Sequence, residues 1–120
     1  MRVKRFEDLA VWQKARDLSV LVYRSTGEGP FTRDWGLRDK IRRAAVSTMS
    51  NIAEGFGRYS RAELRQFLSI ARGSVTEVQS QLYLALELQY NREAEHRALN
   101  DRCIEVSRMI AAFCASIDRT

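Results

Sequence analysis

Apolar residues recur every three or four positions in four stretches of the chain, a spacing that gathers them on one face of an α-helix. The first stretch predicts a helix over residues 9–26, with Asp8 as its N-cap. This helix ends before residues 27–30, because two glycines and a proline are costly inside a helix. Its predicted core face is Leu9, Trp12, Ala15, Ser19, Val22 and Thr26, flanked by Val11, Leu18 and Tyr23.

The same spacing predicts three further helices, over residues 34–56, 61–90 and 93–117. We interpret Gly55 and Gly57 as the end of the first of these helices. Ser60 and Glu63 form a capping-box pattern that starts the next one. The last helix repeats its apolar residues as in the heptads of helical bundles.

No stretch shows the alternation of a β-strand, and one proline and six glycines leave little material for the turns of an all-β fold. Four amphipathic helices with short links are typical of an up-and-down four-helix bundle. We therefore predict an all-α fold in which residues 1–120 form a single domain.

Two of the predicted helices carry more than one face that could be buried. On the third helix, Ile70, Leu84 and Leu88 lie away from the main apolar stripe. On the second helix, a stripe of small and polar residues lies about 100° from the core stripe. Extra apolar surface on a short bundle usually marks contact with another chain, so we expect a homo-oligomer. A plain solvated face is the alternative.

A set of polar side chains on these two helices has two interpretations. In the first, the set fixes the packing of helices or of protomers, because buried polar groups must satisfy one another. Its members are Ser47, Asn51, Glu54, Arg58 and Glu77. In the second, Asn51, Glu54 and Arg72 form the site of a small enzyme or ligand-binding bundle.

Catalytic chemistry has little support in the sequence. His96 is the one histidine, and its charge-rich surroundings predict a solvated side chain. Cys103 and Cys114 lack nearby partners with metal-ligand spacing. The glycines at 55 and 57 follow no strand, so they do not form a nucleotide fingerprint. We therefore expect a protein that is not an enzyme, with no catalytic residues, no metal and no cofactor.

The charge of the chain is uneven. The net charge is +5, and arginine outnumbers lysine by 17 to 3. Residues 1–73 carry 15 basic and 8 acidic side chains, whereas residues 74–120 carry 5 and 7. Arginine suits planar contacts with phosphate, so the basic part of the chain favours a polyanionic partner.

Five arginines are the candidates for binding RNA or DNA. Arg38 and Arg42 lie one turn apart on the second predicted helix. Arg61, Arg65 and Arg72 share a side of the third helix with tyrosines at 83 and 90, a combination that suits phosphate contact and base stacking. Because the chain has no recognised nucleic-acid motif, we expect electrostatic binding without sequence preference. A solvated face is again the alternative, and a protein partner is a further one.

The two cysteines and the first residues of the sequence indicate where in the cell the protein is found. Cys103 and Cys114 lie eleven residues apart in one predicted helix, about 16 Å, which is too far for a disulfide between them. The residues that follow Met1 are charged rather than apolar, so we expect no signal peptide. No apolar run approaches the ~20 residues of a membrane span. These features favour a cytoplasmic protein without a membrane partner.

Several motifs, taken in order, resemble one protein family. They are Phe6-Glu7-Asp8-Leu9, Arg42-Arg43-Ala44-Ala45-Val46-Ser47, Asn51-Ile52-Ala53-Glu54-Gly55 and the stretch from Phe67 to Ser74. The chain is similar in these motifs to the bacterial four-helix bundle family known as 23S rRNA-intervening-sequence proteins. Departures from the usual family pattern are Pro30 before Phe31, Lys40 in place of glutamine, and Thr48-Met49 in place of Ile-Pro.

The resemblance implies more than the residues do alone. It implies a four-helix bundle that assembles as a homopentamer. It also implies a relationship to the accessory variability protein of diversity-generating retroelements, a basic pentamer that binds nucleic acid and a reverse transcriptase. Nucleic-acid binding by this chain is then an expectation by analogy, because a shared fold does not carry function.

Overall fold

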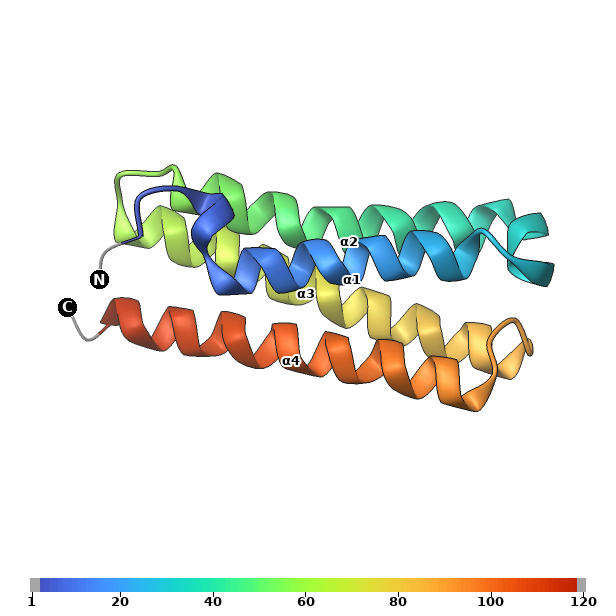
Figure 1. The fold of residues 1–120 in the computed structure, drawn as a ribbon. Helices are drawn as coiled ribbons and strands as arrows, with labels where there is room; N and C mark the ends of the chain where they lie inside the picture. The colour runs from blue at the N-terminus through green and yellow to red at the C-terminus, as the bar shows by residue number, and fades with distance from the viewer. Residues whose placement is uncertain (1–2, 119–120) are drawn as a thin grey trace.

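The structure, a computed structural model, describes residues 3–118 of the chain. Within this range it contains four α-helices: α1 (Ala10–Thr26), α2 (Trp35–Phe56), α3 (Arg61–Glu87) and α4 (Glu93–Asp118). Two short 3-10 helices, η1 (Phe6–Asp8) and η2 (Gly29–Arg33), precede α1 and α2. Figure 1 shows the helices side by side along one long axis.

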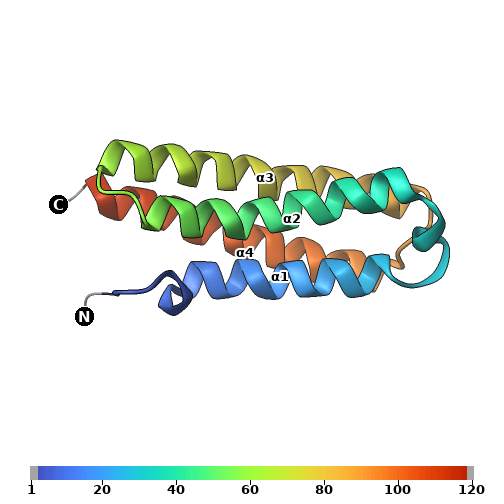
Figure 2. The same cartoon turned by 90° about the horizontal axis from the view of Figure 1, so that it is seen from above.

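Each helix runs antiparallel to the one before it, and α4 returns to pack beside α1 (Figures 1 and 2). The bundle measures 47 × 22 × 20 Å. The links α1–α2 and α3–α4 lie at one end, and the link α2–α3 lies at the other. The predicted all-α four-helix bundle is confirmed. The homopentamer stays a prediction, because the structure contains one copy of the chain.

The core consists of aliphatic side chains from all four helices. Leu18, Ile41, Leu68 and Ile110 are each 0% exposed, one on each helix. On α1, Ala15, Ser19, Val22 and Thr26 of the predicted core face are buried, but the buried face extends to a different side of the helix from the one predicted. Val11 and Leu18, expected at its flanks, are buried, and Leu9 and Trp12 are half-buried.

Two predicted helix ends were wrong. Asp8 does not cap α1, because it lies in η1 and the N-cap position is Leu9. Helix α3 ends at Glu87, three residues before the predicted end. There Gln89 takes a left-handed φ of 61°, and the Tyr90 N–H donates to the Ala85 carbonyl at 2.9 Å. This bond pattern ends a helix and reverses the chain.

The two links at one end of the bundle pack against each other. Phe31, in η2, is 0% exposed, and its ring centroid lies 5.2 Å from that of Tyr90. The Tyr90 hydroxyl donates to Asp34 Oδ2 at 3.0 Å, and this hydrogen bond raises the pKa of Tyr90. Asp34 Oδ1 accepts from the Leu37 N–H at 3.1 Å and so caps α2.

Gly55 has a different role from the one predicted. It lies inside α2 and is buried, rather than ending the helix, and the cap residue is Gly57. A Cβ atom at Gly55 would lie 2.8 Å from the Phe67 Cβ and 3.1 Å from the Leu64 Cδ1. The glycine therefore permits a close crossing of α2 and α3.

Across residues 3–118, none of the helices has the combination of length and hydropathy that crossing a membrane requires.

Candidate functional site

A small polar cluster joins α2 to α3. The Oγ atoms of Ser47 and Ser74 lie 2.8 Å apart in a hydrogen bond. Asn51 Nδ2 donates to the Ser47 carbonyl at 2.8 Å and to the Ser47 Oγ at 3.0 Å. Ser74 is only 7% exposed, so its hydroxyl needs this partner. Two members of the predicted packing set thus lie at a helix–helix contact.

Glu77 lies in the groove beside this cluster. A cavity of about 350 Å³ there is lined by Lys40, Arg43, Ala44, Ser47, Ser74, Glu77 and Gln81. The Gln81 Oε1 atom is buried and has no hydrogen-bond partner. The groove therefore brings two cations, one carboxylate and an unpaired acceptor to the junction of α2 and α3.

Glu54 and Arg58 form a separate pair further along α2. Arg58 Nη2 lies 3.1 Å from Glu54 Oε2, and both side chains are largely exposed. The Arg58 guanidinium also lies 4.9 Å from the centre of the Phe67 ring. Exposed i,i+4 pairs contribute only about 0.3–0.5 kcal/mol, so this ion pair at the end of α2 adds little to the stability of the bundle.

The alternative ligand set is not brought together. Arg72 Nε is 3.5 Å from the Ser107 Oγ, so this side chain lies between α3 and α4. Asn51 contacts Ser47, and Glu54 contacts Arg58, both within α2. Arg72 thus contacts α4, whereas the contacts of Asn51 and Glu54 lie within α2.

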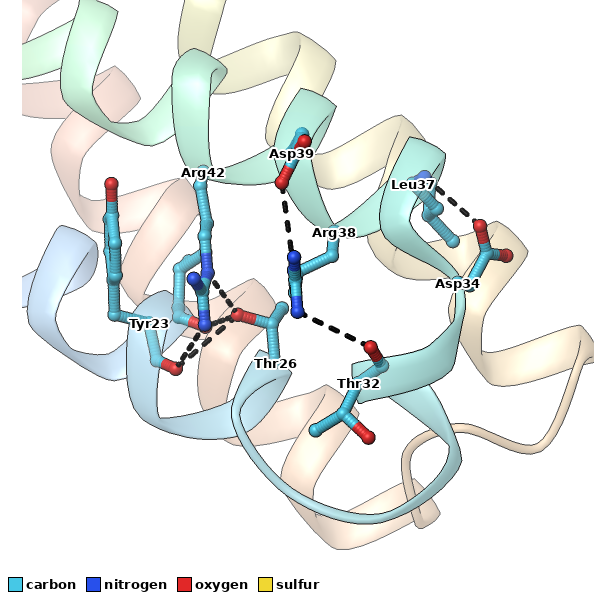
Figure 3. Close-up of polar contacts among 9 residues, drawn as sticks. Tyr23, Thr26, Thr32, Asp34, Leu37, Arg38, Asp39 and Arg42 are labelled. Atoms are coloured by element: carbon cyan, nitrogen blue, oxygen red, sulfur yellow. Dashed lines mark hydrogen bonds and ion pairs between the residues drawn. The ribbon is translucent and has the colours of Figure 1, made fainter.

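Arg42 ties α2 to the end of α1 (Figure 3). Its Nε donates to the Thr26 Oγ1 at 2.8 Å, and its Nη2 donates to the Tyr23 carbonyl at 3.3 Å. The guanidinium also lies 4.5 Å from the centre of the Tyr23 ring. A cation that binds the last carbonyls of a helix stabilises its C-terminus. The Arg42 side chain therefore has a structural role within the chain.

Arg38 makes similar contacts with the link that follows α1. Its Nη1 donates to the Thr32 carbonyl at 3.3 Å, and its Nε lies 3.5 Å from Asp39 Oδ1 (Figure 3). These two arginines lie at the start of α2, whereas Arg61 and Arg65 lie at the start of α3, at the opposite end of the bundle (Figure 1). The five predicted arginines do not form one surface.

Arg61, Arg65 and Arg72 are exposed on α3. Tyr83 lies further along the same helix and is 54% exposed. Tyr90, in contrast, lies beyond the end of α3 and binds Asp34. Of the five predicted arginines, the three on α3 are thus exposed, whereas Arg38 and Arg42 are half-buried.

The prediction for His96 was wrong. The side chain is 8% exposed, and its ring centroid lies 4.8 Å from that of Tyr83, between α3 and α4. Cys103 is fully buried, and burial raises the pKa of its thiol to about 12. At neutral pH this cysteine is therefore a protonated, apolar core residue. Among residues 3–118, no group of three or more His, Cys, Asp or Glu side chains is arranged to hold a metal ion.

The outer face of α3 carries exposed apolar side chains. Ile70, Leu84 and Leu88 are 46%, 50% and 46% exposed. Gly73 lies on the same helix, and no atom lies within 4 Å of the position that a Cβ would take there. The apolar surplus predicted on α3 is therefore not covered within the chain.

Sequence reasoning missed Ser74 as the partner of Ser47. It is a hydroxyl residue between the core positions Ala71 and Val75, and a buried hydroxyl at such a position needs a partner on a neighbouring helix. The inward contacts of Arg42 had no comparable signal, because they depend on where the end of α1 lies in space.

The protein is thus a small up-and-down four-helix bundle with a polar contact between α2 and α3 and an uncovered apolar face. The sequence model of the family described as 23S rRNA-intervening sequence protein matches residues 7–112. The chain belongs to this family, as the motifs of the sequence predicted.

A solved structure shares the fold. It is a protein of unknown function from the S23 ribosomal protein family of Bacteroides thetaiotaomicron, with a TM-score of 0.80 and 21% sequence identity. The match covers 88% of this chain and 98% of that chain. At this identity the likeness shows the fold alone. No curated protein matches the chain.

Proposed function

We propose that the protein is a non-enzymatic helical module of the cytoplasm that works as a homo-oligomer, with five copies as the expected number. The observation that carries the proposal is the outer face of α3. Three large aliphatic side chains on this face, Ile70, Leu84 and Leu88, are about half exposed in the single chain. Exposed apolar surface of this kind is typical of contacts between subunits.

Gly73 adds a second reason for placing the contact on α3. A glycine inside an exposed helix costs about 0.5–1 kcal/mol relative to alanine. No atom of residues 3–118 outside the helix's own backbone lies within 4 Å of a Cβ at this position, so packing within the bundle does not require the glycine. Close approach of a helix from another copy would require it.

Replacing Ile70 and Leu84 together by glutamate should reduce the oligomer to a monomer, because each carboxylate would have to lose water in the contact. Light scattering should give five times 13.8 kDa for the natural chain and 13.8 kDa for the variant. Tyr59→Glu, at a fully exposed position on the link before α3, is the control and should keep the full mass. A natural chain that is monomeric at micromolar concentration would overturn the proposal.

The exposed α3 arginines support a second function, electrostatic binding of RNA or DNA. Assembly would repeat Arg61, Arg65 and Arg72 in each copy, and repeated weak contacts strengthen binding through multivalency. Arg38 and Arg42 are half-buried and contribute less to this proposal.

Replacing Arg61, Arg65 and Arg72 together by glutamine should weaken nucleic-acid binding equally for all sequences. Each phosphate that the variant no longer neutralises should reduce the slope of log affinity against log salt by about 0.9 on duplex DNA. Gel shifts over a salt series measure this slope. The matched control replaces Arg97, Arg102 and Arg108 on α4, which removes the same charge from another helix. Absence of binding at low salt, or equally weakened binding by both triple variants, would contradict the prediction.

A further inference from the structure

A cavity lies between α1 and α2, away from the α3 face proposed for self-association. Its volume is about 460 Å³, and it is lined by Arg16, Ser19, Val20, Tyr23, Arg24 and Met49. We call it the α1/α2 groove. Val20 and Tyr23 are 42% and 44% exposed, so the chain does not cover them.

The wall of the α1/α2 groove is apolar. Met49 packs against the core from α2, and Val20 faces it from α1. Val20, Tyr23 and Met49 are the apolar side chains among its lining residues. A nucleobase would lose its hydrogen bonds to water in such a place, whereas an aliphatic or aromatic side chain would lose none.

The rim of the groove is cationic. Arg16 and Arg24 lie eight residues apart on α1, a rise of about 12 Å or two turns. No acidic side chain lines the cavity, although Asp17 Oδ1 lies 3.1 Å from Arg16 Nη2 beside it. The cavities at Glu54, Glu77 and Glu28, in contrast, each include a carboxylate.

One face of the Tyr23 ring is covered by Arg42, so a nucleobase could not stack on both faces of this ring. The Arg42 guanidinium lies 4.5 Å from the ring centre. Tyr23, Val20 and Met49 together form a preformed apolar site. Preformed sites lose little conformational entropy on binding.

We propose that the α1/α2 groove binds an acidic amphipathic segment of a partner protein. An aliphatic or aromatic side chain of the segment occupies the apolar cavity, and carboxylates on either side of it pair with Arg16 and Arg24. Helices that dock in a groove present anchors at such a spacing. This proposal goes beyond self-association, because it assigns the α1/α2 groove to a partner of another sequence, and the mass of the oligomer is measured beside peptide binding to keep the two apart.

The test uses labelled helical peptides of defined composition and fluorescence anisotropy. The acidic probe has 16 residues, with leucines at every third or fourth position and glutamates on both flanks. The matched probes replace all glutamates by lysine, or all leucines by serine. We expect the full chain to bind the acidic probe at least about tenfold more tightly than either control, a difference of ~1.4 kcal/mol.

Variants of the protein locate the binding. Val20→Glu and Arg24→Glu should each weaken binding of the acidic probe about tenfold or more, which corresponds to ~1.4 kcal/mol. Arg24→Glu should also improve binding of the lysine probe. Ile70→Glu, on the α3 face, should bind the acidic probe as the natural chain does. This variant therefore distinguishes a loss of peptide binding from a loss of self-association. Circular dichroism verifies folding, and Val20→Ser replaces Val20→Glu if the latter does not fold.

Four results would overturn the proposal. Equal binding of the acidic and lysine probes would remove the charge complementarity. Unchanged binding by the Val20 variant would place the peptide elsewhere. Loss of oligomer mass in the Val20 variant would show that another copy covers the groove. Binding of an RNA oligonucleotide that the Val20 variant abolishes would assign the groove to nucleic acid.

Discussion

Phe31→Ala should lower the free energy of unfolding by about 3–5 kcal/mol, the cost of removing a large aromatic side chain from a packed site. Phe31 is 0% exposed although it lies in the link η2 rather than in one of the four main helices. Its ring meets Tyr90, so the truncation also removes the packing that joins the two links at this end of the bundle. Such a loss is a large part of the ~5–15 kcal/mol that stabilises a typical domain.

Urea unfolding at one fixed protein concentration measures this effect, since self-association makes stability depend on concentration. Tyr59→Ala is the control, because it removes an aromatic side chain that is fully exposed. It should change the free energy of unfolding by less than about 0.5 kcal/mol. A Phe31→Ala variant as stable as the control would mean that the links do not contribute to the core.

The helices were predictable because their apolar spacing is local information. Each helix needs one buried stripe, and the stripe is visible in the sequence whichever helix it packs against. The ends were less predictable where tertiary contacts decide them. Helix α3 ends early because Gln89 takes a left-handed conformation and Tyr90 turns back to Asp34, on a link 56 residues away.

The candidate site was predictable only in part, for the same reason. Ser47 and Asn51 are one turn apart on one helix, so their proximity follows from the sequence. Arg42 and His96 depend on what lies opposite them. Arg42 lies at the end of α1, and His96 lies against Tyr83. The sequence alone predicts that both side chains are solvated, whereas in the structure each one packs on a tyrosine ring.

Gly55→Ala should destabilise the bundle, in contrast to the usual effect of replacing a helical glycine. Its Cβ would lie 2.8 Å from the Phe67 Cβ, an atom bonded to the α3 backbone that cannot rotate away. Helix α2 would have to move away from α3, and overpacking of this kind costs about 1–3 kcal/mol. The better helix propensity of alanine, worth about 0.5–1 kcal/mol, offsets part of this cost.

The matched control for Gly55 lies on the same helix. A Cβ at Gly36 would have Asp34 Oδ1 as its nearest neighbour, at an ordinary contact distance of 3.8 Å. Gly36→Ala should therefore leave stability unchanged or raise it by up to about 1 kcal/mol. Adding Leu64→Ala to Gly55→Ala should not restore stability, because the Phe67 Cβ stays in place. If urea unfolding shows the two alanine variants to be equally stable, the distance between α2 and α3 is not set by the glycine, and the helices separate at little cost.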